Sequence, residues 1–302
     1  MMNTALLHEN TKIPEHVDHD PFHFDYVDSD EPNALAFCSD GYSFIGVTIP
    51  LLEQLWQAST HLSESPFISS TMDIQLTDHE RDNMTVPQRI QVATFSLQLF
   101  FIVLHEFTHV VHGHVRRGSS NHGFSNEVLV REQGSLEQQA READADGYAV
   151  YFMLANIIDA AHERAHLLDV LGQKAKPVDV QDQILLLSFT TAVAAFFFIR
   201  TPQLLTATSA YQLTHPPQAA RMNLAMKAIQ SWCVQNRPAL VDWMTLERFQ
   251  NLMRAVASAT RGMNGDHDWS EQVKFLRSDI GTEYFRKLDD GLIRQVKALG
   301  HP

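Results

Sequence analysis

The sequence feature that most restricts the fold is a polar cluster inside an apolar segment, FFIVLHEFTHVVHGH at residues 100–114. Its titratable side chains are His105, Glu106, His109, His112 and His114. Burial of ionisable groups is costly unless a metal ion or a charged partner satisfies them. We therefore expect this segment to belong to a site that other elements of the chain complete.

The segment lies in a predicted helix. Thr85 followed by Gln88, with Pro87 in the first turn, is typical of a helix start, and the apolar pattern continues to Val115. Residues 105–109 then form an HExxH sequence within a helix, which is the context that gives this motif its meaning.

The spacing of the motif favours a metal site. Positions i and i+4 of a helix stack on one face, about 6 Å apart along the axis. His105 and His109 can therefore each offer a ring nitrogen to one Zn²⁺ ion. Glu106 follows His105 directly, so its carboxylate points beside the metal, where it can take a proton from a water molecule that the metal activates.

A catalytic zinc needs a third protein ligand, and several residues are candidates. His112 and His114 follow on the same helix, but three collinear positions cannot converge on one tetrahedral ion unless the chain bends, so we expect these two rings to support the site or to lie at the surface. The better candidate is Glu142, in a second helix that Ser135 and Gln138 are predicted to open.

The sequence EADADGYA at residues 142–149 places Glu142 and Asp146 on one helix face, with Asp144 pointing the opposite way. Glu142 would be the ligand, and Asp146 would accept a hydrogen bond from the outer nitrogen of a ligating histidine. The small residues Ala140, Ala143 and Gly147 would let the two helices approach closely. Two further carboxylates, Glu137 and Glu132, remain alternative ligands.

Composition excludes some classes of protein. The net charge of −13 leaves no basic stripe for nucleic acid. The two cysteines form no CxxC pair, which favours a reduced, cytoplasmic setting. The uncharged run at 184–199 has 16 residues, fewer than the ~20 that cross a bilayer, so we expect a buried helix and no stable membrane insertion.

The expected fold is mainly α with a small N-terminal β-sheet. Residues 1–30 read as a loose leader, 31–237 as a zincin-like catalytic domain, and 238–302 as a C-terminal helical segment. A hairpin is predicted over 33–49, and the polar stretch 63–84 is expected to be a loop.

Three ordered motifs resemble those of the gluzincin peptidases of the Ste24/HtpX type: HExxH, then ExxAD at 142–146, then THPPQAARM at 214–222. The layout is most similar to the soluble phage-exclusion Lit-type peptidases, which have chains of similar length. The resemblance covers about residues 33–225. It implies a zinc-dependent endopeptidase in which His215 stabilises the oxyanion and Arg221 pairs with an acidic group such as Asp146.

The expected activity is therefore hydrolysis of a protein or peptide substrate, with phage defence as a possible role. The alternative is a zinc-stabilised sensor or regulatory protein that acts by binding a partner. An intact Glu106 argues against that alternative, because a purely structural zinc site has no need of a general base. Substrate identity and oligomeric state cannot be read from the sequence.

Overall fold

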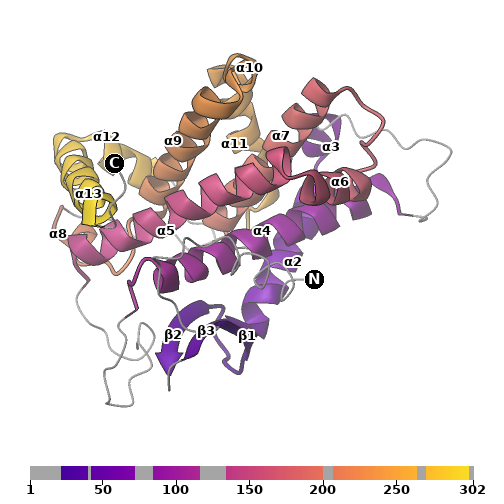
Figure 1. Cartoon of the computed structure of the whole chain (residues 1–302). Coiled ribbons are helices and arrows are strands. Elements are labelled where there is room, and N and C mark those ends of the chain that lie inside the picture. The colour runs from indigo at the N-terminus through magenta and orange to yellow at the C-terminus, as the bar shows by residue number, and fades with distance from the viewer. Residues whose placement is uncertain are drawn as a thin grey trace.

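A computed structural model describes residues 22–39, 42–71, 84–115, 134–199, 207–263 and 270–298. The prediction of a mainly α fold with a small N-terminal sheet is confirmed (Figure 1). The strands are β1 (Phe22–Val27), β2 (Ala34–Ser39) and β3 (Tyr42–Thr48). The helices are α2 (Ile49–Ser63), α3 (Pro66–Thr71), α4 (Val86–Val111), α5 (Leu136–Leu154), the π-helical turn η1 (Ala155–Asp159), α6 (Ala161–Val170), α7 (Val178–Phe198), α8 (Ala207–Ala210), α9 (Gln218–Asn236), α10 (Pro238–Trp243), α11 (Leu246–Ala259), α12 (Ser270–Arg277) and α13 (Asp279–Ala298).

The sheet has the order β1-β3-β2, with β3 antiparallel to β2 and parallel to β1. The β2–β3 pair is the predicted hairpin. The prediction of a loose leader over 1–30 is wrong for β1, because Phe22 and Phe24 alternate with polar residues and pack against the core. The rings of Phe22 and Phe107 lie 4.9 Å apart, so β1 is fixed to the helix that carries the HExxH sequence.

Helix α4 begins where the capping signal predicts. The Thr85 side chain accepts a hydrogen bond from the Gln88 backbone, and the Gln88 side chain accepts one from the Thr85 backbone at 2.8 Å. The helix ends at Val111, four residues before the predicted end. The reason is Gly113, which adopts a positive φ of 68° and turns the chain back over the last helical turn.

Helix α5 also begins as predicted, with the Ser135 side chain accepting from the Gln138 backbone. It packs directly against α4, so the two polar sequences face each other across one interface (Figure 1). Helix α5 ends at Leu154, where the π-helical turn η1 begins. The expectation of a loop over 63–84 is wrong for the short helix α3, while residues 72–83 lie outside the described residues.

The expected buried helix at 184–199 is the core helix α7. Within the described parts of the chain, α4 and α7 are long and apolar enough to cross a membrane, but 61% and 83% of their apolar windows are buried inside the protein. Such burial is typical of the core helices of a soluble protein.

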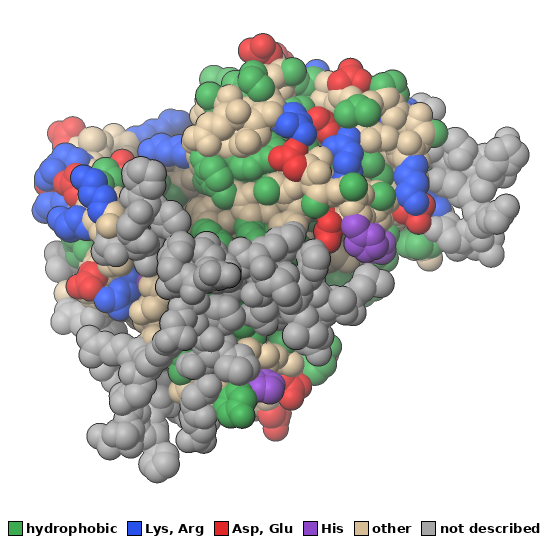
Figure 2. Space-filling model, in the orientation of Figure 1, with side chains coloured by type: hydrophobic (Ala, Val, Ile, Leu, Met, Phe, Trp, Pro, Cys, Tyr) green, Lys and Arg blue, Asp and Glu red, His purple; other side chains and the backbone are tan. Residues whose placement is uncertain are grey.

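The C-terminal helices pack on the helices of the site, α13 against α5 and α12 against α9. Gln139, fully buried on α5, links three parts of the chain. Its amide donates hydrogen bonds to the carbonyl oxygens of Ala210 and Leu213, and it accepts one from the Tyr284 hydroxyl of α13 at 2.6 Å. On the face in Figure 2, Lys and Arg side chains over α12 and α13 are interspersed with Asp and Glu, as expected for solvated helix surfaces.

Candidate metal centre and active site

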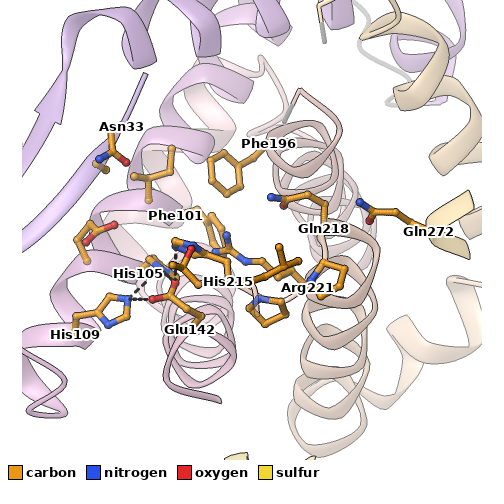
Figure 3. Close-up of a pocket in the computed structure, with 17 residues that line it drawn as sticks. Asn33, Phe101, His105, His109, Glu142, Phe196, His215, Gln218, Arg221 and Gln272 are labelled. Atoms are coloured by element: carbon orange, nitrogen blue, oxygen red, sulfur yellow. Dashed lines mark hydrogen bonds and ion pairs between the residues drawn. The ribbon is translucent and has the colours of Figure 1, made fainter. Parts of the chain in front are cut away.

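The α4–α5 interface brings the three predicted metal ligands together (Figure 3). The Nε2 atoms of His105 and His109 lie 3.1 Å apart. Glu142 reaches both rings from α5, with Oε2 at 3.2 Å from His105 Nε2 and Oε1 at 3.4 Å from His109 Nε2. All three residues are buried. The helix pair thus converges two imidazole nitrogens and one carboxylate on a single point.

The donor set fits a zinc ion. Ligand atoms at about 2.0–2.1 Å from a tetrahedral zinc are separated from one another by about 3.3–3.4 Å. The observed separations of 3.1–3.4 Å match this value closely. Two nitrogens and one oxygen are also the ligand types found in catalytic zinc sites that keep a fourth position for water.

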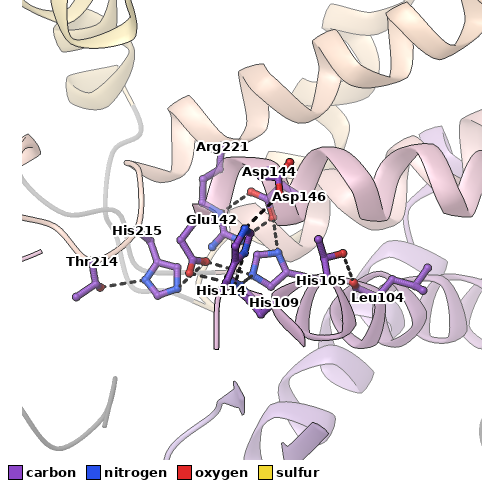
Figure 4. A network of polar contacts seen from close by, with 11 residues as sticks. Leu104, His105, His109, His114, Glu142, Asp144, Asp146, Thr214, His215 and Arg221 are labelled. Atoms are coloured by element: carbon purple, nitrogen blue, oxygen red, sulfur yellow. Dashed lines mark hydrogen bonds and ion pairs between the residues drawn. The ribbon is translucent and has the colours of Figure 1, made fainter. Parts of the chain in front are cut away.

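Asp146 and Arg221 stand behind His105 (Figure 4). Asp146 Oδ1 lies 2.9 Å from His105 Nδ1, on the side of the ring away from Glu142. Arg221, from α9, donates two hydrogen bonds of 2.8 Å to the same carboxylate, one from Nε and one from Nη2. The structure therefore pairs Arg221 with Asp146, the acidic partner named from the sequence.

These contacts decide the charges in the metal-free site. Burial alone lowers the pKa of His105, but contact with Asp146 and Glu142 outweighs it and raises the pKa to about 10. Burial raises the pKa of Glu142, but the charges of His215 and His109 hold it well below its usual value. The site is thus a compensated set of carboxylates and imidazolium rings, from which a metal ion would displace protons.

His215 joins this group from the loop that leads into α9. Its Nε2 lies 3.1 Å from Glu142 Oε2, and its Nδ1 is 3.0 Å from the Thr214 hydroxyl. The His215 side chain is 36% exposed, whereas those of His105 and His109 are 8% and 11% exposed. Of these three rings, His215 is therefore the one most open to an incoming molecule.

A cavity of about 150 Å³ opens in front of these residues. A water molecule needs about 10–15 Å³ of such volume, so the cavity has room for several water molecules. Glu106 lines it together with the three proposed ligands. The wall is completed by Phe101 and Phe196 and by amide side chains from three other elements, Asn33, Gln218 and Gln272.

The structure does not support the alternative ligand Glu137. Glu137 is exposed on the first turn of α5 and pairs with Arg141, and Glu132 falls outside the described residues. Gly147 has no atom within 4 Å of an added Cβ, and Ala140 packs on α13, so the expectation that these two residues let α4 approach α5 is wrong.

Sequence reasoning missed two parts of the site. Asp144 does not point away into solvent. Its buried carboxylate contacts His112 and His114, and the sequence His112-Gly113-His114 shortly after the HExxH motif was the available signal. Gln272 reaches the cavity from the C-terminal segment, and no local pattern marks it. Its position depends on tertiary packing alone.

Comparison with known protein families places the chain among the peptidases. A sequence model described as Peptidase U49 matches residues 53–236, a range that contains the HExxH helix, the Glu142 helix and the loop carrying His215. No curated protein and no solved structure matches the chain. The matched range covers more than half of the sequence, and the chain therefore belongs to the Peptidase U49 family of Lit-type peptidases.

Proposed function

We propose that this peptidase is a zinc-dependent endopeptidase that cleaves a protein substrate. The observation that carries the proposal is the convergence of His105 Nε2, His109 Nε2 and the Glu142 carboxylate, which lie 3.1–3.4 Å from one another, close to the spacing of ligands around one tetrahedral zinc ion. When bound, zinc supplies Lewis-acid chemistry that lowers the pKa of a water molecule and polarises a carbonyl group.

Residues of the chain transfer the proton, bind the substrate's carbonyl oxygen and orient a zinc ligand. Glu106 lines the cavity next to His105, where its carboxylate takes a proton from water and later delivers it to the departing amine. His215, with an exposed ring held by Thr214, donates a hydrogen bond to the substrate's carbonyl oxygen as negative charge develops there. Asp146 and Arg221 fix the orientation of His105.

The test combines metal analysis with a cleavage assay on fluorescently labelled unfolded proteins. Glu106→Gln is expected to retain one zinc ion per chain and to lose activity, since the amide cannot accept the proton. Glu142→Ala is expected to lose zinc as well. Glu53→Gln, the same change on an exposed position of α2, serves as the control. Mass spectrometry of the fragments distinguishes internal cleavage from removal of terminal residues.

The outcome also separates hydrolysis from partner binding. The role in phage exclusion that we propose rests on the Lit-type resemblance, and phage plating on cells that express each variant measures it. Zinc-loaded Glu106→Gln should fail to exclude phage. If that variant excludes phage as well as the wild type does, the protein acts by binding, as a zinc-stabilised sensor, and the hydrolytic proposal is wrong.

A further inference from the structure

The two proposed histidine ligands use their outer nitrogens differently (Figure 4). His105 Nδ1 faces the carboxylate of Asp146 at 2.9 Å. His109 Nδ1 faces another ring, with His114 Nδ1 at 3.1 Å. Because a metal-binding histidine is usually held by a carboxylate, a backbone carbonyl or water, the imidazole behind His109 needs an explanation.

The turn after α4 places His114 there. Gly113, with its positive φ, reverses the chain, and the His114 backbone N–H donates to the His109 carbonyl oxygen at 2.8 Å. The His114 side chain, only 4% exposed, then lies over the last helical turn with its ring 5.1 Å from that of His109. The position of His114 is therefore set by the backbone and does not depend on a metal ion.

Asp144 lies on the far side of His114. Its carboxylate is buried, with 8% of the side chain exposed, and Oδ2 accepts a hydrogen bond of 2.5 Å from His112 Nδ1. The same oxygen is 3.3 Å from His114 Nε2. The contact between Asp144 and His114 is not a hydrogen bond, because His114 Nε2 is buried and has no hydrogen-bond partner. Asp144 therefore acts on His114 through its negative charge.

Only one placement of protons suits a metal at His109. Binding through Nε2 requires that His109 carry its proton on Nδ1, as a donor toward His114. His114 Nδ1 must then be the acceptor, which leaves the His114 proton on Nε2, facing the negative Asp144. The opposite tautomer of His114 would set two N–H groups against each other at 3.1 Å.

We propose that Asp144 is a positioning residue for the metal centre: acting through His114, it selects the tautomer of His109 that offers Nε2 to the metal. Helix α5 would then support both histidine ligands, His105 directly through Asp146 and His109 indirectly through Asp144. This proposal rests on the zinc site proposed above.

The same cluster could instead be a second metal site, since His112, His114 and Asp144 offer three ligand atoms close together. The 2.5 Å separation between His112 Nδ1 and Asp144 Oδ2 opposes this, because two ligands of one zinc ion lie about 3.3 Å apart. The distance is that of a short charge-assisted hydrogen bond. The stoichiometry of bound zinc decides between the two.

The test is zinc affinity, measured by competition with a fluorescent chelator, together with zinc stoichiometry. Asp144→Asn keeps the shape of the side chain and removes its charge, and we expect about 10-fold weaker binding. His114→Phe keeps a ring without nitrogens and should weaken binding by about 10- to 100-fold. His114→Asn retains an acceptor near His109 and should recover much of that loss. Asp289→Asn and His166→Gln, at exposed positions, are the controls.

A double variant shows whether Asp144 acts through His114. An asparagine at position 114 has no ring tautomer to select, so Asp144→Asn should cost almost nothing in the His114→Asn background. An equal cost in both backgrounds would mean that Asp144 does not act through His114 and would overturn the proposal. Circular dichroism checks that each variant folds. If Asp144→Asn does not fold, the zinc affinities of the His114 variants test the proposal.

The remaining outcomes are distinct. One zinc ion per chain with unchanged affinity in Asp144→Asn and His114→Phe overturns this inference and leaves the proposed peptidase site standing. Two zinc ions in the wild type, one of them lost in Asp144→Asn, overturn it in favour of a second metal site. A wild-type protein that binds no zinc removes the proposed function itself.

Discussion

Replacing Arg221 with methionine is expected to destabilise the fold strongly, because it leaves the Asp146 carboxylate buried without its main partner. The two side chains are 7% and 1% exposed and share two hydrogen bonds of 2.8 Å between α9 and α5. Methionine retains much of the apolar stem but removes the charged guanidinium, whose central carbon lies 5.2 Å from the centroid of the Phe197 ring. The variant therefore isolates the loss of the charge and its hydrogen bonds.

The expected magnitude follows from the burial of the pair. Removing one partner of a buried ion pair costs about 3–5 kcal/mol. His105 still faces Asp146 at 2.9 Å and compensates part of the charge, which places Arg221→Met near the lower end of that range. Arg141→Met is the matched control, since Arg141 pairs with Glu137 at a site where the two side chains are 34% and 68% exposed. That change should cost at most about 1 kcal/mol.

The assay is urea denaturation of the metal-free protein, followed by circular dichroism. The double variant Arg221→Met, Asp146→Asn should regain part of the loss, with a coupling energy of about 1–3 kcal/mol, because the uncompensated charge is then gone. If Arg221→Met costs no more than Arg141→Met, or if the Arg221→Met and Asp146→Asn changes are simply additive, the pair does not contribute in the way its burial indicates.

Two further predictions concern pH and the loop that carries His215. The pKa of His105 is raised from 6.5 to about 10 in the metal-free protein, so the stability from its charged form is fully present below pH 6.5 and is lost as the pH rises toward 10. The melting temperature with chelator should fall across this window and that of the zinc-loaded protein should fall less; a rise in the metal-free protein would contradict the assignment. In Gly134→Ala, the new Cβ would lie 2.0 Å from the Leu213 carbonyl oxygen, so the backbone before His215 must move. Cleavage should slow by about 10- to 100-fold with zinc binding retained, whereas Gly147→Ala, where an added Cβ meets no atom within 4 Å, should leave activity unchanged.

Much of the site could be predicted because it depends on helix periodicity and on capping. The i, i+4 spacing set the facing pairs on α4 and α5, and the side chains of Thr85 and Ser135 marked where these helices begin. Their mutual approach could be expected from buried charge, since the polar groups of each helix needed partners. The three motifs did not predict the register of α5 along α4, because side-chain packing sets it.

The parts that were missed depend on backbone reversal or on distant segments. The contact of His114 with His109 requires the left-handed conformation of Gly113, and the helical pattern alone predicted continuation to Val115. Strand β1 could not be predicted from its own residues, because six residues of alternating apolar and polar side chains are weak evidence for a strand. Its parallel pairing with β3 is seen only in the structure. The C-terminal segment has no signal of its own for reaching the cavity.

The hydrogen bonds of Gln139 indicate that the range matched by the family, which ends at residue 236, is shorter than the active protein needs. The Tyr284 hydroxyl donates to Gln139, whose amide holds the Leu213 carbonyl two residues before His215. A chain trimmed at residue 236 would keep every motif, yet it would strip the cover from α5 and leave a buried amide oxygen without its donor. Substitutions within residues 237–302 can therefore shift the loop that carries His215 without changing any of the three motifs, and relatives that differ there need not be equally active.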